Sequence, residues 1–121
     1  MKKLLLPFFL FSVFYCAAQD QRIWGTYYGG EDWDGVRCIA SDVWGNIYIS
    51  GMTQSQSGFT SGGFQNVYGG GTGDAYLVKF NSSGNRLWAT YYGGTELDES
   101  YDITIDPSGN VYITGRTYST R

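Results

Sequence analysis

Residues 106–117 read DPSGNVYITGRT and residues 42–53 read DVWGNIYISGMT, and these two stretches decide the fold. Each begins with Asp, has Gly at the fourth position, and continues with β-branched and aromatic residues. Asp at the start of a turn accepts a hydrogen bond from the backbone two residues later, and Gly at the fourth position supplies the left-handed conformation of a bulged hairpin. Residues 81–84 (NSSG) follow the same pattern. We therefore predict three β-hairpins.

The two stretches belong to a longer internal repeat. Residues 23–55 align without a gap on residues 87–119, with sixteen of 33 positions identical at an offset of 64. Such self-similarity indicates duplication of one structural unit. Reading outward from the turns predicts seven strands, at 22–28, 36–42, 46–52, 74–81, 85–92, 101–106 and 110–117.

The predicted strands are apolar on both faces, so their sheets must be covered on both sides. Stacked four-stranded antiparallel sheets satisfy this, and a ring of such blades is the usual closed form. We therefore predict an all-β fold of β-propeller blades. Residues 36–92 form a full blade, 101–117 a half blade, and strand 22–28 closes the last blade. The mature chain, 19–121, then supplies under two blades of a larger propeller. A ring assembled from separate short chains is the alternative.

Three motifs carry a resemblance to a known family: LWATYYGG at 87–94, DPSGNVYITGRT at 106–117 and DAYLVKFNSSG at 74–84. Together they resemble the bacterial beta-propeller repeat of exported surface proteins. The resemblance implies a seven-bladed propeller whose remaining blades lie on the same polypeptide. It brings no catalytic motif. The chain departs from the family at Thr60 and Gly63, where the family has Pro and Ala.

The N-terminus has the three parts of a secretory signal. Two lysines precede an apolar stretch at 4–15, and small residues follow, so cleavage after residue 18 leaves Gln19 as the new terminus. This predicts a secreted or outer cell-surface protein. A buried N-terminal helix and a lipoprotein acylated at Cys16 are the alternatives. After cleavage Cys38 is the one remaining cysteine, which excludes an intrachain disulfide, and we expect it to be a small buried apolar residue.

Composition excludes several classes of protein. The 121 residues include no histidine, so this chain alone cannot build a Ser-His-Asp triad or a His-rich zinc site. The formal net charge is −3 and no basic patch is present, which argues against nucleic acid as a partner. No second long apolar run follows the signal, so we expect no membrane span.

The connection at 54–73 is a candidate binding segment. It is rich in Gly, Ser, Thr and Gln, and connections of this length inside a compact sheet are usually functional or disordered. Phe59, Phe64 and Tyr68 recur along it every four or five residues. One interpretation is that these aromatics hold the loop against the blade. The other is that they contact a carbohydrate or a partner protein.

Acidic residues follow each Gly-Gly pair, and among them Asp34 and Asp98 repeat as identities. The structural interpretation is a carboxylate that accepts backbone N–H groups at the start of the inner strand. Two alternatives are a weak calcium site, which would be the one cofactor of this chain, and a catalytic pair. A repeated residue usually serves every blade rather than one active site. We therefore assign no catalytic residue and no metal ligand.

These observations leave two functions open. The first is an exported binding or scaffolding module whose partner is a surface protein or a carbohydrate. The alternative is the N-terminal part of an extracellular polysaccharide hydrolase or lyase with its active site on other blades.

We also expect the hairpin glycines to be required for positive φ and the glycines at 69–71 to tolerate replacement.

Overall fold

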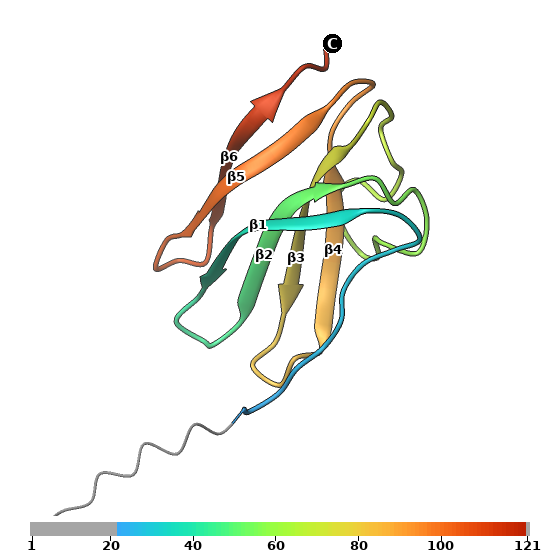
Figure 1. Cartoon of the computed structure of the whole chain (residues 1–121). Helices are drawn as coiled ribbons and strands as arrows, with labels where there is room; N and C mark the ends of the chain where they lie inside the picture. The colour runs from blue at the N-terminus through green and yellow to red at the C-terminus, as the bar shows by residue number, and fades with distance from the viewer. Residues whose placement is uncertain (1–21, 121) are drawn as a thin grey trace, which may run out of the picture.

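The structure, a computed structural model, describes residues 22–120, and its regular elements are all β-strands. Four strands form one antiparallel sheet in chain order: β1 (Asp34–Ser41), β2 (Ile47–Thr53), β3 (Asp74–Phe80) and β4 (Arg86–Tyr92). A second antiparallel sheet pairs β5 (Asp98–Ile105) with β6 (Val111–Thr117), as Figure 1 shows. In this part of the chain no helix has the length and apolarity to cross a membrane. The predicted signal at 1–18 lies outside the described residues.

The strands expected for a blade at 36–92 are those of the four-stranded sheet. β1 and β5 begin earlier than expected, at Asp34 and Asp98, because these residues pair with Thr53 and Thr117 on the neighbouring strands. Residues 22–28, which were expected to form a strand of the last blade, form no strand with the sheets described here. These residues run beside the sheet without joining a ladder, and Tyr28 reaches the core through its side chain.

The three hairpin turns have the predicted chemistry. Asp42 accepts the backbone N–H groups of Trp44 and Asn46 on one carboxylate oxygen, and Asp106 accepts those of Ser108 and Asn110 in the same way. The turn glycines lie in the left-handed region, at φ values of 79°, 83° and 85°. They are Gly45, Gly84 and Gly109. The repeat therefore conserves its turns because one side chain and one glycine fix each of them.

The expectation that the glycines at 69–71 tolerate replacement is wrong. Gly71 lies at φ 65°, and a β-carbon there would lie 2.6 Å from the backbone of Glu96. A β-carbon on Gly69 would lie 2.4 Å from the carbonyl oxygen of Gly94. The loop packs closely against the Gly-Gly turn that follows β4, and a side chain on either glycine would separate the two segments.

The first strand of each unit, β1 in the first and β5 in the second, contains a β-bulge at the same point of the repeat. Arg37 in β1 and Tyr101 in β5 are the extra residues, and they lie 64 positions apart. Gly51 and Gly115 lie on the facing strands, and a β-carbon on either would lie 1.9 Å from a backbone oxygen of the bulged strand. Bulges bend a strand and redirect its side chains. Here they direct Arg37 and Tyr101 outward.

The hydrophobic core lies on one face of the four-stranded sheet. Its buried members come from β3, β4 and the long loop: Phe59, Tyr76, Val78, Phe80, Ala89 and Tyr91. Tyr28 from the N-terminal segment packs edge-on against Phe59 with ring centroids 4.9 Å apart, and its hydroxyl donates to the Phe59 carbonyl oxygen at 2.5 Å. The segment before β1 and the loop before β3 therefore cover this face together.

The β5–β6 hairpin covers part of the opposite face. The hydroxyl oxygens of Ser50 in β2 and Ser100 in β5 lie 2.5 Å apart, and the Ser100 oxygen also lies 3.2 Å from the carbonyl oxygen of Gly51. Ile103 of β5 is buried at this contact. The two sheets are stacked face to face, which is the arrangement that apolar strands on both faces require.

Candidate functional site

The repeated carboxylates Asp34 and Asp98 are part of the framework of the sheets. Asp34 accepts the backbone N–H of Gly30 at 2.8 Å, and Asp98 accepts that of Gly94 at 2.7 Å. A serine hydroxyl donates to the same oxygen in each case, Ser55 at 3.2 Å and Ser119 at 2.8 Å. The two contacts repeat at the offset of 64. The predicted acceptance of backbone N–H groups at the start of the inner strand is confirmed.

A third carboxylate, Asp74, has the same role at the start of β3 and was not singled out from the sequence. It accepts the N–H of Gly69 at 2.6 Å, and its side chain is buried. Its other oxygen, Oδ1, has no hydrogen-bond partner among the described groups. Burial and the nearby Asp98 carboxylate raise the pKa of Asp74 to about 6, against the opposing hydrogen bond from Gly69. The Asp74 carboxyl therefore keeps its proton to a higher pH than an ordinary Asp.

The loop aromatics divide into two groups. Phe59 is 0% exposed and stacks on Tyr91 with centroids 5.7 Å apart, so it holds the loop against the sheet and offers no surface to a partner. Tyr68 packs edge-on against the same Tyr91 and is partly buried. Phe64 is 94% exposed. Of the three predicted binding residues, only Phe64 presents a free aromatic ring.

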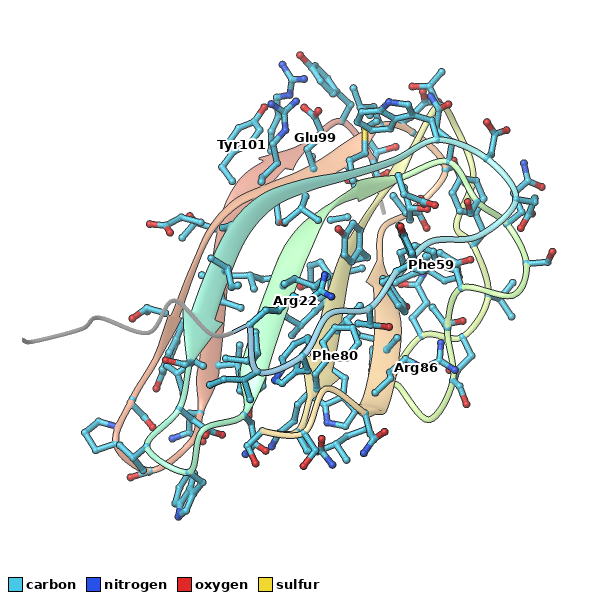
Figure 2. All side chains as sticks on the ribbon, turned by 60° about the horizontal axis from the view of Figure 1, so that its bottom comes forward. Arg22, Phe59, Phe80, Arg86, Glu99 and Tyr101 are labelled. Atoms are coloured by element: carbon cyan, nitrogen blue, oxygen red, sulfur yellow. The ribbon has the colours of Figure 1, made fainter. Side chains whose placement is uncertain are left out.

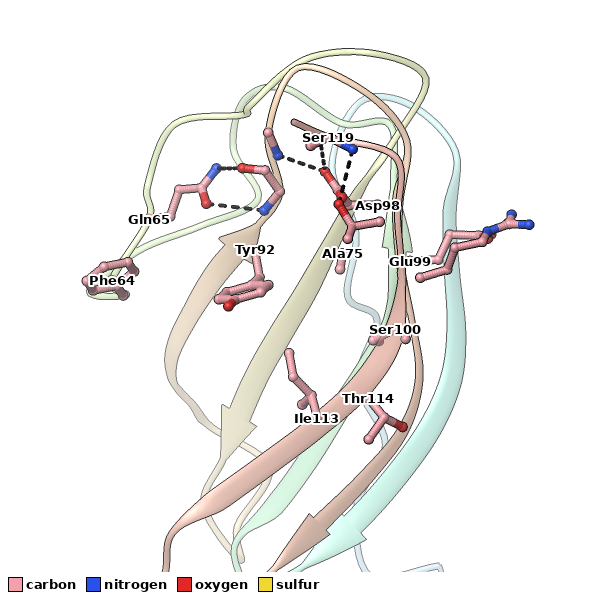
Figure 3. A pocket seen from close by; sticks show the side chains of 15 residues that line it. Phe64, Gln65, Ala75, Tyr92, Asp98, Glu99, Ser100, Ile113, Thr114 and Ser119 are labelled. Atoms are coloured by element: carbon pink, nitrogen blue, oxygen red, sulfur yellow. Dashed lines mark hydrogen bonds and ion pairs between the residues drawn. The ribbon is translucent and has the colours of Figure 1, made fainter. Parts of the chain in front are cut away.

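Phe64 lies at the rim of a cavity of about 430 Å³ between the two sheets (Figure 3). Tyr92, Asp98 and Ile113 also line it. Tyr92 repeats Tyr28, and Ile113 repeats Ile49, both of which pack against the core in the first unit. The cavity thus occupies the place that the long loop and β3 fill in the first unit.

A polar cluster that the repeat did not predict lies at the start of β5. Glu99 is 8% exposed, and its Oε2 accepts the Arg116 guanidinium at 2.5 Å and the Tyr101 hydroxyl at 3.0 Å. Arg37 from the first sheet approaches Oε1 at 3.6 Å. Burial opposes the charge of Glu99, but the donors Tyr101 and Arg116 lower its pKa below the usual range. Figure 2 shows Glu99 and Tyr101 side by side at one edge of the molecule.

Residues 22–120 contain no group of three or more Cys, Asp or Glu side chains arranged to hold a metal ion. Asp34 and Asp98 each accept hydrogen bonds from a backbone N–H and a serine hydroxyl of their own unit. Cys38 is half-buried, and burial raises the pKa of its thiol. The repeated polar groups, Asp34 and Asp98 with their donors, hold the framework together. The cluster around Glu99 is not repeated.

Comparison with known families agrees with this geometry. Residues 87–121 match the family model described as the beta-propeller repeat. The matched segment contains the second copy of the repeat with its hairpin turn, and it confirms the resemblance inferred from the sequence. A comparison with curated proteins found no match. The chain thus carries a beta-propeller repeat on an all-β fold.

Proposed function

We propose that this protein is an exported, cell-surface β-propeller module that acts in binding or scaffolding, with no catalytic centre in this chain. The observation that carries the proposal is the use of the repeated carboxylates. Asp34 and Asp98 are each engaged by a backbone N–H and a serine hydroxyl of their own unit. A general acid or nucleophile needs a carboxylate that faces a substrate, and these two face the sheets instead.

The side chains that remain at the surface are suited to contact. Phe64 is an exposed aromatic, and Arg37 and Tyr101 project from the bulges of β1 and β5. Exposed aromatic and arginine side chains are the residue types that dominate binding energy at protein interfaces. The bulge residue differs in type between the two units, Arg37 in the first and Tyr101 in the second, whereas the framework does not differ.

Further repeats complete the ring in this proposal. The cavity beside Tyr92 and Ile113 has the same surroundings as the filled core of the first unit. An added unit supplies the missing counterparts of Phe59 and Tyr76, and residues 22–28 find a strand to pair with in the last blade. The partners of this chain are thus the remaining blades of the polypeptide and a surface protein or carbohydrate.

The export signal at 1–18 supplies the location. Deleting it should retain the protein in the cytoplasm, and cell fractionation with a cytoplasmic marker measures this. If the protein that still carries residues 1–18 were also retained inside the cell, this would contradict an extracellular role.

The functional test uses the full-length protein on a glycan array and a panel of polysaccharide substrates. The proposal expects retention of a ligand without turnover. Release of reducing ends or unsaturated products that is lost on replacing a residue of this chain would overturn it in favour of a hydrolase or lyase.

A further inference from the structure

The cluster around Glu99 is built from non-repeated residues on a repeated frame. Aligned at the offset of 64, Glu99, Tyr101 and Arg116 stand where the first unit has Gly35, Arg37 and Met52. The surrounding framework is identical in the two units, including the starting Asp, the Gly opposite the bulge and the Thr that ends the second strand. The blade therefore does not need these charges for its own fold.

The bulges bring the cluster together across the two sheets. Arg37 is the extra residue of β1 and Tyr101 that of β5. Glu99 and Arg116 are directly opposed on β5 and β6. Figure 3 shows the neighbouring Asp98 and Glu99 pointing to opposite sides of β5, so Asp98 serves the framework while Glu99 faces the cluster.

The arginines have more donors than the single acid can satisfy. Glu99 Oε2 already accepts from Arg116 and Tyr101, and Oε1 lies 3.6 Å from Arg37, outside hydrogen-bond distance. The side chains of Arg37 and Arg116 are 52% and 44% exposed. Each guanidinium carries five N–H donors in a planar fork. Two cations around one anion leave a net positive charge on the surface of a chain that is acidic as a whole.

Aromatic rings flank these donors. The Arg116 guanidinium lies over the Tyr118 ring, 4.9 Å from its centroid, and the Tyr101 hydroxyl is fixed on Glu99. Both tyrosines are about half exposed. A ring held in place beside a guanidinium combines an apolar platform with a fork that binds an anionic group.

We propose that Arg37, Arg116, Tyr101 and Tyr118 form a binding site for an anionic saccharide, with Glu99 as the buried residue that positions the arginines. The guanidinium forks bind the carboxylate or sulfate ester of the sugar, and the tyrosine rings pack against its C–H face. A sugar ring uses both features at once, whereas an acidic peptide side chain uses the forks alone. The inference rests on the proposed binding function and names its ligand class.

The test measures binding of the full-length protein to four probes by titration calorimetry: hexagalacturonate, a sulfated hexasaccharide, a neutral hexasaccharide and hexaglutamate. We expect one of the two anionic saccharides to bind in preference to the neutral one. Arg37→Gln should weaken that binding by about tenfold or more, as expected for the loss of a charge-assisted hydrogen bond. Tyr101→Ala should weaken it too.

Arg22→Gln is the matched control, because it removes an exposed arginine that Figure 2 places well away from Glu99. It should leave the affinity unchanged, and an unchanged melting temperature of Arg37→Gln shows that the variant is folded. Arg37→Lys keeps the charge without the planar fork and should restore only part of the affinity.

Three results would overturn the inference: no preference for either anionic saccharide, an affinity that Arg37→Gln leaves intact, or hexaglutamate bound as well as the sugars. The last would assign the site to an acidic protein. Binding of a neutral glycan or a protein at another part of the molecule would contradict this site but would still support the binding function. Turnover that depends on this chain would sink the binding function itself.

Discussion

Ser50 in β2 and Ser100 in β5 bring their hydroxyl oxygens within 2.5 Å of each other across the two stacked sheets. Both side chains are buried, and Ser50 also donates to the carbonyl oxygen of Tyr76. A hydroxyl pair in this position adds a buried polar contact between the two stacked sheets. The pair is not repeated, because the counterpart of Ser100 in the first unit is Val36.

Replacing Ser100 by Val should therefore destabilise the stacking of the two sheets. The change leaves the Gly51 carbonyl oxygen and the Ser50 hydroxyl without this partner, a loss of about 1–3 kcal/mol in the free energy of unfolding. Chemical denaturation of the full-length protein measures the effect. The control is Val36→Ser at the equivalent, exposed position, which should change stability little. Equal effects of the two changes would contradict this role of the pair.

Phe59→Ala should destabilise the protein by about 3–5 kcal/mol. The ring is buried between Tyr28, Tyr76 and Tyr91, so its removal opens a cavity in the core. Phe64→Ala is the matched control from the same loop and should cost almost nothing, because its ring is exposed. Thermal denaturation of both variants distinguishes the two roles. A large effect at Phe64 would show that this ring packs against the fold.

Gly51→Ala should be one of the most damaging single substitutions. The added methyl group would lie 1.9 Å from the carbonyl oxygen of Gly35, so the bulge of β1 would have to open. Gly58→Ala is the control. Gly58 has positive φ but no atom within 4 Å of the added β-carbon, so its cost is limited to backbone strain of about 1 kcal/mol. Comparable melting temperatures for the two variants would contradict the close approach at the bulge.

Asp74 should make the protein less stable as the pH rises. Its folded-state pKa of about 6 lies above the ordinary value of 3.8, so its contribution to stability is fully present below pH 3.8. That contribution is lost as the pH increases through 6, because the unfolded state ionises more readily. Asp74→Asn preserves the acceptor for Gly69 without the charge. At pH 7 the variant should be about 1–2 kcal/mol more stable than the parent.

The measurement for Asp74 is the free energy of unfolding between pH 4 and pH 8. The difference between variant and parent should grow across this range and level off above pH 7. Asp106→Asn is a useful contrast. Hydrogen bonds from Asn110, Ser108 and Tyr112 lower the pKa of Asp106, so its contribution is lost on acidification instead. A difference for Asp74→Asn that does not change with pH would show that the carboxyl stays ionised when buried.

Much of the candidate site was not predicted from the sequence, although part of the signal was there. Phe59, Phe64 and Tyr68 form one series along the loop, yet only their packing separates the buried ring from the exposed one. Glu99, Tyr101 and Arg116 are each a mismatch between the two aligned repeats. Attention to the mismatches, rather than to the identities, was the signal that would have found the cluster.

The sequence by itself determined the local structure of this protein. The Asp or Asn and the Gly of each turn specify the hairpins through bonds that span two to four residues, and the alternation of apolar residues specifies the strands between them. Duplication then determined that the same unit occurs twice. These features depend on near neighbours in the chain, which a pattern in the sequence records directly.

Only the tertiary structure decided which side chains meet across the sheets. The Ser50–Ser100 contact joins residues 50 positions apart, and the approach of Arg37 to Glu99 depends on two bulges and on the stacking of the sheets. Residues 22–28 repeat a strand in sequence and yet form none, because a strand requires a neighbouring edge as well as a propensity. Contacts of this kind arise from packing between distant segments, which no local pattern encodes.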